Sequence, residues 1–464
     1  MDKFRSEHDL LGDKQAPLEV YYGVQTVRAM ENFVVSNIPI SHFPYLIQSL
    51  GYIKKATALA NMEYKILDPI IGDAIIKACD QIIDGKYLAQ FPVDAIQGGA
   101  GTSTNMNANE VIANIALEIL GKKKGDYTVV HPNNHVNLSQ STNDVYPTSI
   151  RMTAAWMLEG LFDELLNFKE ALEAKGLEFH DVIKMGRTQL QDAIPMTLGQ
   201  EFIAWAVTVG EDIERLRMAQ TIMYEINMGA TAIGTGLNAP AGYAEVVTRY
   251  LAHITRLPLV PSRNLIKATQ DSGSFIELSG VLKRIAAKVS KICNDLRLLS
   301  SGPRAGINEI NLPPMQPGSS IMPGKVNPVI PEVVNQVAFD VIGNDLAITL
   351  AAEAGQLELN VMEPLIAFKL FTSIQRLTNV LKILTQRCIV GITANKERCR
   401  EMVQNSIGLV TALVPVLGYE KCSEIAKKAL STHGSVYKIV LDEGHLSKED
   451  LDRILSPKAM LNPF

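Results

Sequence analysis

The chain has 464 residues, of which 47% are apolar and 20% are charged, and its formal net charge is −5. These proportions predict a folded protein with a large core rather than a disordered chain. Because the chain has no basic excess, nucleic acid is not an expected partner. The sequence contains no apolar run of about 18 residues, so no membrane span is expected.

The first residues and the cysteines bear on the location of the protein. Residues 1–8 are mostly polar and lack the apolar stretch of a signal peptide. The five cysteines are scattered along the chain, and none belongs to a Cys-x-x-Cys pair. This pattern predicts reduced thiols in a cytoplasmic protein, with Cys293 in a helical core rather than in a catalytic role.

Helical patterns dominate the chain. Residues 1–140 carry short patterns interrupted by polar loops. Longer patterns follow, and the clearest covers residues 274–299, where apolar residues recur at steps of three and four. A helix of that length measures roughly 40 Å at about 1.5 Å per residue. Comparable patterns cover residues 150–178, 196–228, 330–351 and 361–390, and the patterns shorten again after residue 395.

This succession predicts a mainly all-α protein with a central bundle of long helices. We expect a small-helix domain at 1–140, the long-helix bundle at 141–395 and a small helical domain at 396–464. Apolar residues such as Leu282 and Val289 lie on more than one face of the long helices. One chain offers too few neighbouring elements to cover these faces, so we expect oligomerisation through the long helices.

Four polar segments, expected to be loops, are dense in short hydroxyl and amide side chains. In a single segment these residues are most simply explained as caps of the helices that follow. Four such segments together favour a binding site. They offer many neutral donors, one lysine and few charged acceptors, which suits a small dianion such as a dicarboxylate. The segments are residues 98–107, 131–144, 185–192 and 318–328, and the lysine is Lys325.

Two other kinds of site fit the sequence less well. A phosphate-binding P-loop needs four residues between its glycines and a hydroxyl after the lysine, but five residues separate Gly318 from Gly324, and Val326 follows Lys325. His131 and His135 have the spacing of a helical metal-ligand pair, but Pro132 places them in a loop. We therefore expect a structural role for the histidines and no metal site.

The segment at 318–328 resembles the signature of the aspartase/fumarase superfamily. The resemblance extends over nearly the whole chain, and its motifs occur in the family's order. It implies three mainly helical domains and a homotetramer whose central helices form one joint bundle, with each active site built from loops of three subunits. The other matching segments are residues 5–12, 21–29, 98–109, 139–144, 186–192, 301–306 and 355–362.

Within this superfamily the chain is more similar to the ammonia-lyases than to the hydratases. Hydratases usually have a serine in place of Thr142 and a histidine in place of Gln189. Expelling hydroxide needs an acid, whereas ammonia leaves as a neutral molecule, and a glutamine cannot transfer protons. Ala305 after Arg304 also matches the ammonia-lyases, while the role of Glu332, the usual partner of the missing histidine, stays open.

The resemblance implies elimination of ammonia from L-aspartate to give fumarate, with no required cofactor and with metal activation left open. Ser319 is the expected base that removes the Cβ proton, and the resulting enediolate needs aimed donors, each contributing about 3 kcal/mol. Gly318 and Gly324 suggest that this loop closes as a lid. The expected enediolate donors are Thr102, Ser141, Thr142 and Ser320; Thr188, Lys325 and Asn327 bind the other carboxylate, and Asn143 and Gln189 face the amino group.

Two alternatives to an ammonia-lyase remain at this point. A fumarate hydratase would use the same loops on a hydroxy acid. A non-catalytic scaffold of the same fold would have no use for Ser319, Lys325 and Asn327. Argininosuccinate and adenylosuccinate lyases match the 318–328 segment only loosely, and their bulky substrates need more room.

Overall fold

The computed structural model describes residues 3–456 and 459, and most of these residues lie in helices. The mainly α prediction is therefore confirmed. The chain forms two compact units, each assembled from three separate stretches of sequence. Unit 1 comprises Met1–Phe162, Glu214–Arg284 and Asp340–Leu377, and unit 2 comprises Asp163–Ile213, Ile285–Phe339 and Thr378–Phe464.

Unit 1 contains the shorter helices of the N-terminal third and two more between residues 243 and 270. Helix α2 packs against α3 and α7, and α3 packs against α4. Local chemistry explains where they begin: α2 starts at Pro44, and the Asp68 carboxylate caps α3 by accepting from the amides of Ile70 and Ile71. These helices are α1 (Val24–Asn32), α2 (Pro44–Glu63), α3 (Pro69–Ile83), α4 (Thr102–Ile119), α7 (Tyr243–Thr255) and α8 (Leu265–Gln270).

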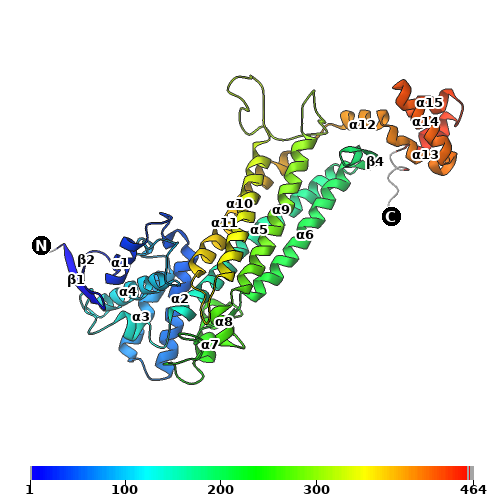
Figure 1. The fold of residues 1–464 in the computed structure, drawn as a ribbon. Helices are drawn as coiled ribbons and strands as arrows, with labels where there is room; N and C mark the ends of the chain where they lie inside the picture. The colour runs from blue at the N-terminus through cyan, green and yellow to red at the C-terminus, as the bar shows by residue number, and fades with distance from the viewer. Residues whose placement is uncertain (1–2, 457–458, 460–464) are drawn as a thin grey trace. The chain divides into compact units, whose positions relative to one another are not determined.

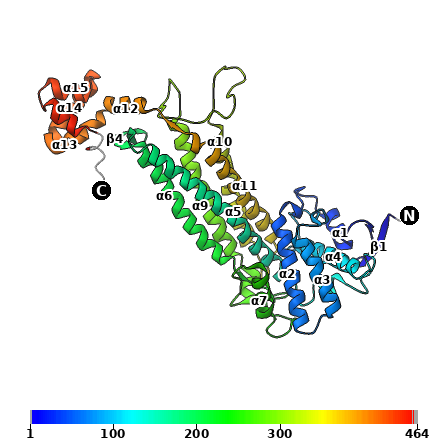
Figure 2. The same cartoon turned by 180° about the vertical axis from the view of Figure 1, so that it is seen from behind.

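Five long helices follow the predicted central patterns, and each contributes residues to both units. Within each unit their segments lie side by side (Figure 1, Figure 2). In unit 1, Lys283 Nζ of α9 lies 2.6 Å from Asp345 Oδ2 of α10, and in unit 2 Asn335 of α10 donates to Ser290 of α9. The helices are α5 (Thr142–Glu178), α6 (Leu198–Ile222), α9 (Gly273–Leu299), α10 (Val329–Glu353) and α11 (Glu363–Arg387).

The helix predicted from the apolar pattern at 196–228 is shorter in the structure. Helix α6 ends at Ile222, and Glu225–Ile226 form strand β5, which pairs in parallel with Val260–Pro261 of β6. Ile226 and Met228 are fully buried, so the apolar spacing continues beyond the helix without a glycine or proline to mark its end.

Unit 2 contains a β-hairpin and the C-terminal helices. Residues 185–192 were expected to be a loop, but most of them lie in strands β3 and β4, which pair antiparallel. Ile183 and Met185 both point into the core, a spacing of two that the polar tip obscures. The C-terminal helices are α12 (Lys396–Asn405), α13 (Val410–Leu417), α14 (Tyr419–Thr432), α15 (Val436–Asp442) and α16 (Lys448–Ile454).

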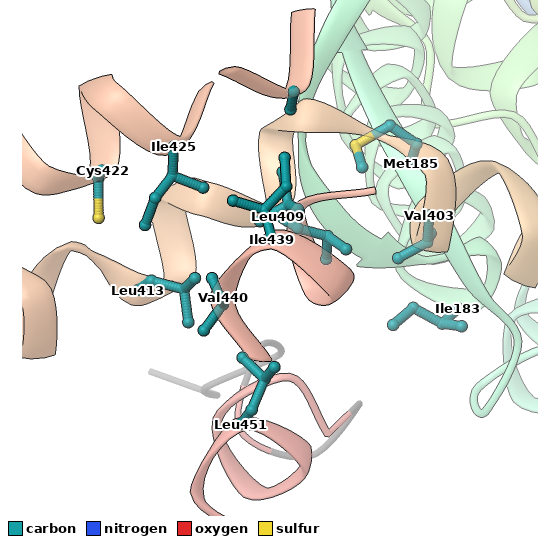
Figure 3. Packing of buried hydrophobic residues seen from close by; sticks show 12 residues of the cluster. Ile183, Met185, Val403, Leu409, Leu413, Cys422, Ile425, Ile439, Val440 and Leu451 are labelled. Atoms are coloured by element: carbon teal, nitrogen blue, oxygen red, sulfur yellow. The ribbon is translucent and has the colours of Figure 1, made fainter. Parts of the chain in front are cut away.

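A hydrophobic cluster joins this hairpin to the C-terminal helices. Ile183 and Met185 of β3 pack with Val403 of α12 and with Leu409 and Leu413 (Figure 3). Residues 457–458 and 460–464 of the predicted 396–464 domain, and residues 1–2 of the predicted 1–140 domain, lie outside the described residues.

The strands of the described residues form four two-stranded sheets. Among these residues, no helix combines the length and apolar character needed to cross a bilayer. All five cysteines are free and buried, and Cys293 lies in the core of α9 as expected. The strands are β1 (Phe4–Asp9), β2 (Gly12–Pro17), β3 (Ile183–Thr188), β4 (Gln191–Thr197), β5 (Glu225–Ile226), β6 (Val260–Pro261), β7 (Ile310–Asn311) and β8 (Thr393–Ala394).

Candidate active site

Thr102 is the first residue of helix α4 in unit 1 and is exposed. Of the expected loop at 98–107, residues 102–107 are therefore helical. Gly101, in the left-handed region at φ 87°, makes the turn into the helix, and a Cβ there would lie 2.4 Å from the buried ring of Tyr146. Only glycine fits this position. The start of α4 was not predicted because its first residues carry hydroxyl and amide side chains, which show no apolar spacing.

Thr102 lines a cavity of about 780 Å³ within unit 1 together with Arg28, Gly98 and His131. The Arg28 guanidinium binds Asp9 at two points, with Nε to Oδ2 at 2.8 Å and Nη2 to Oδ1 at 2.9 Å. This bonding holds the pKa of Asp9 below its ordinary value. Arg28 belongs to the matching segment 21–29 but was not among the predicted site residues, because no spacing in the sequence places it beside Gly98 and Thr102.

His131 and His135 shape the turn at Pro132–Val136 in unit 1. His131 Nδ1 accepts from the backbone amide of Asn133 at 3.0 Å, and His135 Nδ1 accepts from the His131 amide at 2.8 Å. Burial lowers the pKa of both imidazoles. Each imidazole thus accepts a backbone hydrogen bond within the turn, which agrees with the structural role expected for these histidines.

Ser141 immediately precedes α5, which begins with Thr142 and Asn143, so the expected loop is helical from residue 142 onward. The Asn143 amide donates to Ser141 Oγ at 3.2 Å, and the Ser141 amide donates to Asp144 Oδ1 at 3.0 Å. This reciprocal arrangement is a helix cap, so capping explains part of the serine's presence. Asn143 Nδ2 donates to the Ala232 carbonyl at 2.7 Å.

A buried polar network holds the residues that precede α5. Lys54 is fully buried, and its Nζ donates to Asn137 Oδ1 at 3.0 Å and to Gln140 Oε1 at 2.8 Å. Asn105 Nδ2 connects Asn137 to Thr142 Oγ1, at 3.1 Å from each oxygen. Burial lowers the pKa of Lys54 to about 7. Thr142 is therefore hydrogen-bonded to a buried network through Asn105, which the spacing of residues in the sequence did not predict.

Thr188 and Gln189 lie at the exposed tip of the β3–β4 hairpin in unit 2. Thr188 is opposite Gln191 in the register. Gln189 and Leu190 connect the strands with φ values of 54° and 61°. Two successive left-handed residues are typical of a tight I′ hairpin turn, and Gln189 is exposed there.

The segment at 318–328 in unit 2 folds back on itself. The Gly318 amide donates to the Lys325 carbonyl at 2.7 Å, and Asn327 Nδ2 donates to the Gly318 carbonyl at 2.7 Å. Ser319 Oγ accepts from the amides of Ile321 and Met322 at 3.2 and 3.0 Å. These two donors are of the kind that stabilises a serine alkoxide.

Two of the predicted site residues in this segment are open to solvent. Lys325, expected to bind a substrate carboxylate, is exposed in the single chain, as is Ser320. One N–H of the Asn327 side-chain amide, which was expected to bind a carboxylate, donates to the Gly318 carbonyl, and the group has a second N–H. Ser319 and Lys325 line a shallow cavity of about 480 Å³ with residues of the same segment, including Met315 and Pro323. The side chains stay exposed because the loop is closed by hydrogen bonds between its own residues, with glycines and prolines fixing the path of the backbone.

The predicted site residues thus fall into two groups. Residues 102 and 141–143 belong to unit 1, and residues 188–189 and 319–327 belong to unit 2. Glu332 lies in the first turn of α10 and is half-buried. Among the described residues, no cluster of histidine, cysteine, aspartate and glutamate side chains has the arrangement of a metal site.

Comparison with known proteins adds an independent observation. A family model described as lyase matches residues 12–343, and one described as fumarase C C-terminus matches residues 409–462. The aspartate ammonia-lyase of Pseudomonas fluorescens is 59% identical over 461 residues, which cover 99% of this chain and 96% of that protein.

Solved structures agree with this assignment. A Brucella melitensis protein described as fumarate lyase:delta crystallin, bound to cobalt, is 52% identical with a TM-score of 0.97, over 99% of this chain and 100% of its own. A class II fumarase from Schistosoma mansoni is 34% identical with a TM-score of 0.94, over 98% of this chain and 99% of its own. The motifs, the helical architecture and these full-length similarities lead to one conclusion: the chain belongs to the aspartase/fumarase superfamily of lyases.

Proposed function

We propose that this chain is an aspartate ammonia-lyase, which converts L-aspartate reversibly to fumarate and ammonia. The full-length 59% identity to an enzyme of that name carries the proposal. The fumarase noted above is 34% identical over a similar span. Gln189 at the hairpin tip supports the same choice, because an amide can orient an amine but cannot supply the acid that hydroxide loss needs.

In the proposed mechanism Ser319 removes a proton from Cβ of aspartate. A serine hydroxyl is a weak base, so its alkoxide must be stabilised by nearby donors. The amides of Ile321 and Met322 already donate to Ser319 Oγ, which supports this role. Closure of the loop around the substrate would exclude water and strengthen these bonds.

The enediolate that forms next carries two negative charges on the side-chain carboxylate. Donors aimed at those oxygens lower its energy, each by about 3 kcal/mol when they are already in place. We propose that Lys325, Asn327 and Thr188 bind the other carboxylate, and that Asn143 and Gln189 orient the departing amine. The proposed donors to the enediolate are Thr102, Ser141, Thr142 and Ser320.

A direct assay tests this function. Adding L-aspartate to the protein should raise the ultraviolet absorbance of fumarate, with one ammonia released per fumarate formed. In the reverse direction, fumarate with ammonium should give aspartate. Formation of malate from fumarate without ammonium would instead identify a hydratase, which the similarity to the Schistosoma fumarase keeps as the second candidate. No elimination from any amino or hydroxy dicarboxylate would support a scaffold.

We also propose a homotetramer in which loops of different subunits complete each site. Helix α10 carries a stripe of exposed apolar side chains at helical spacing: Phe339 is 64%, Leu346 61% and Leu350 60% exposed. A continuous apolar face of this kind marks an interface. An exposed 318–328 loop in the single chain also fits a site that a neighbouring subunit completes.

Light scattering on two matched leucine variants tests the assembly. Leu346→Glu should reduce the molar mass from that of a tetramer, because it places a charge in the proposed interface. Leu430→Glu is the control, since Leu430 is also 61% exposed but lies on α14. Dissociation by both variants, or by neither, would contradict an interface on α10.

Three further expectations remain proposals. Catalysis should need no cofactor, because hydrogen-bond donors and one lysine stabilise the developing charge. A protein dialysed against EDTA should therefore keep its turnover.

Five free, buried cysteines support a cytoplasmic location. The division at residues 1–140, 141–395 and 396–464 is a proposal about domains, and limited proteolysis near its boundaries tests it.

A further inference from the structure

The tip of the β3–β4 hairpin has a conformation that its own residues do not favour. Gln189 and Leu190 are both in the left-handed region, which costs free energy for residues other than glycine, asparagine and aspartate. Such a conformation persists only where the surroundings impose it. Directly below the tip, Arg187 and Asp192 are opposite each other in the register. Both residues are tethered through their side chains.

The first tether is a buried ion pair. Arg187 Nη1 donates to Glu309 Oε1 at 2.8 Å, and the Glu309 side chain has no solvent exposure. Lys184 Nζ lies 3.0 Å from Glu309 Oε2, without the alignment of a hydrogen bond, and 2.6 Å from Glu201 Oε2. A buried carboxylate between two cations is strongly held, because removing one partner leaves an uncompensated charge.

Glu309 is itself fixed by the backbone on both sides. Its amide donates to the Leu299 carbonyl at 2.9 Å, at the end of α9. Its carbonyl accepts from the Asn395 amide at 2.8 Å, just before α12. The next residue, Ile310, pairs with Ala394 in the β7–β8 sheet. The carboxylate therefore belongs to a rigid part of unit 2 and can act as an anchor for Arg187.

The second tether comes from the C-terminal helices. Ser406, at the end of α12, donates from Oγ to Asp192 Oδ2 at 2.7 Å. Its hydroxyl also accepts from the Gly408 amide at 3.0 Å, and the residue is buried. Lower on the hairpin, Ile183 and Met185 pack in the cluster that Figure 3 shows. Both strands are thus attached at the level just below the turn.

We propose that Glu309 and Ser406 are positioning residues, which act through Arg187 and Asp192 to hold Thr188 and Gln189 in place for the substrate. The proposal rests on the function proposed above, because it is the binding of aspartate that gives the hairpin tip its role. It gives the C-terminal helices a part in catalysis although none of the predicted site residues lies on them. A displacement of about 1 Å at a binding group is enough to slow a reaction substantially.

Steady-state kinetics on L-aspartate test this coupling. Ser406→Ala removes the hydrogen bond to Asp192 and the one from the Gly408 amide, and it should lower kcat/KM by about 10-fold. Replacing both tip groups, in Thr188→Val/Gln189→Ala, should lower it further. If Ser406 acts through the tip, adding Ser406→Ala to that variant should lower kcat/KM by no more than about 2-fold, because the tip no longer carries the groups being positioned. Multiplying effects would overturn the proposal.

Glu309 requires a graded pair of variants. Glu309→Gln leaves Arg187 without its buried counter-charge, although Lys184 keeps Glu201, so it combines loss of positioning with loss of stability. Glu309→Asp keeps the charge and should recover at least part of the activity that Glu309→Gln loses. Ser423→Ala is the control for the serine variant, because its hydroxyl only donates within α14 and should leave kcat/KM unchanged.

Hydrogen–deuterium exchange separates this inference from the proposed function. In Ser406→Ala the backbone amides of residues 185–192 should exchange faster than in the wild type, while those of α14 should not change. This readout does not need turnover. If the wild type fails to deaminate aspartate but Ser406→Ala still exchanges faster at residues 185–192, only the proposed function is contradicted. Unchanged exchange at the tip would contradict the positioning roles.

Discussion

The two groups of predicted site residues are held in different ways. In unit 1, Thr142 is buried and receives a hydrogen bond from Asn105, which belongs to the network around the buried Lys54. In unit 2, Ser319 and Lys325 lie on a loop whose hydrogen bonds mostly join its own residues. Thr142 is therefore held in place before substrate arrives, as electrostatic stabilisation requires. The loop at 318–328 exposes side chains such as Lys325 and needs further contacts to enclose a ligand.

This difference predicts that substitutions in the two groups affect catalysis and the free energy of unfolding differently. Changes in the exposed loop should alter turnover or binding with little effect on the fold, because few neighbours depend on those side chains. Changes in the buried network should alter both, because an unpaired polar group in the interior costs free energy. The following variants test the comparison, beginning with the largest expected effect.

Ser319→Ala should lower kcat for aspartate by about 10³-fold or more while leaving the thermal midpoint unchanged, because it removes the proposed base. Stopped or continuous fumarate detection with a parallel melting curve measures both. Ser431→Ala, in a helix of the C-terminal region, is the control and should keep full activity. A Ser319→Ala enzyme with near-normal turnover would exclude Ser319 as the base.

Lys325→Met should raise KM for aspartate by about 10²-fold, with a smaller change in kcat, because it removes the charge that pairs with a substrate carboxylate. Initial rates across a wide range of aspartate concentrations separate the two constants. Lys123→Met is the control, since Lys123 is also exposed but lies in unit 1 away from the predicted loops. An unchanged KM would contradict carboxylate binding by Lys325.

Thr142→Val tests the buried group. It keeps the shape of the side chain but leaves Asn105 with one acceptor fewer, so the free energy of unfolding should fall by about 1 kcal/mol. Turnover should also fall, by about 10-fold, because a proposed enediolate donor is lost. Denaturant unfolding and kinetics on the same preparation measure the two effects. A loss of activity at unchanged stability would show that the network does not hold Thr142.

Glu363 tests whether buried charge in unit 1 affects stability without touching the proposed site. Burial raises the pKa of Glu363 to about 8, opposed by Arg151, and its Oε2 has no hydrogen-bond partner among the described residues. The folded state therefore holds this proton more tightly than the unfolded state. The glutamate's contribution to stability falls as pH rises from the ordinary value near 4.5 to about 8.

Glu363→Gln cannot lose that proton, so the variant should gain on the wild type as pH rises. We expect the thermal midpoint of the variant relative to the wild type to increase by a few degrees between pH 5 and about 9. Melting curves at several pH values measure the difference. A difference that stays constant with pH would show that Glu363 does not titrate in this range.

The sequence predicted the long helices well because their apolar spacing persists over many turns. The predicted pattern at 274–299 corresponds to α9 at Gly273–Leu299. Sequence-based prediction failed in two kinds of place. Helix α4 begins at Thr102 with polar residues that give no apolar spacing, and after Ile222 the apolar spacing continues past the end of α6. The hairpin that carries Gln189 was also taken for a loop, because its tip is polar and its strands are short.

The sequence by itself determined the superfamily, the mainly helical architecture and the ammonia-lyase assignment, which the comparisons confirm. These depend on local chemistry and long ordered motifs, which a single chain displays. Only the tertiary structure decided which buried groups support the predicted site residues. Lys54 is connected to Thr142 through Asn137 and Asn105, and Glu309 binds Arg187 next to the hairpin tip. Such supports join residues far apart in sequence, and their strength comes from burial, which no spacing rule contains.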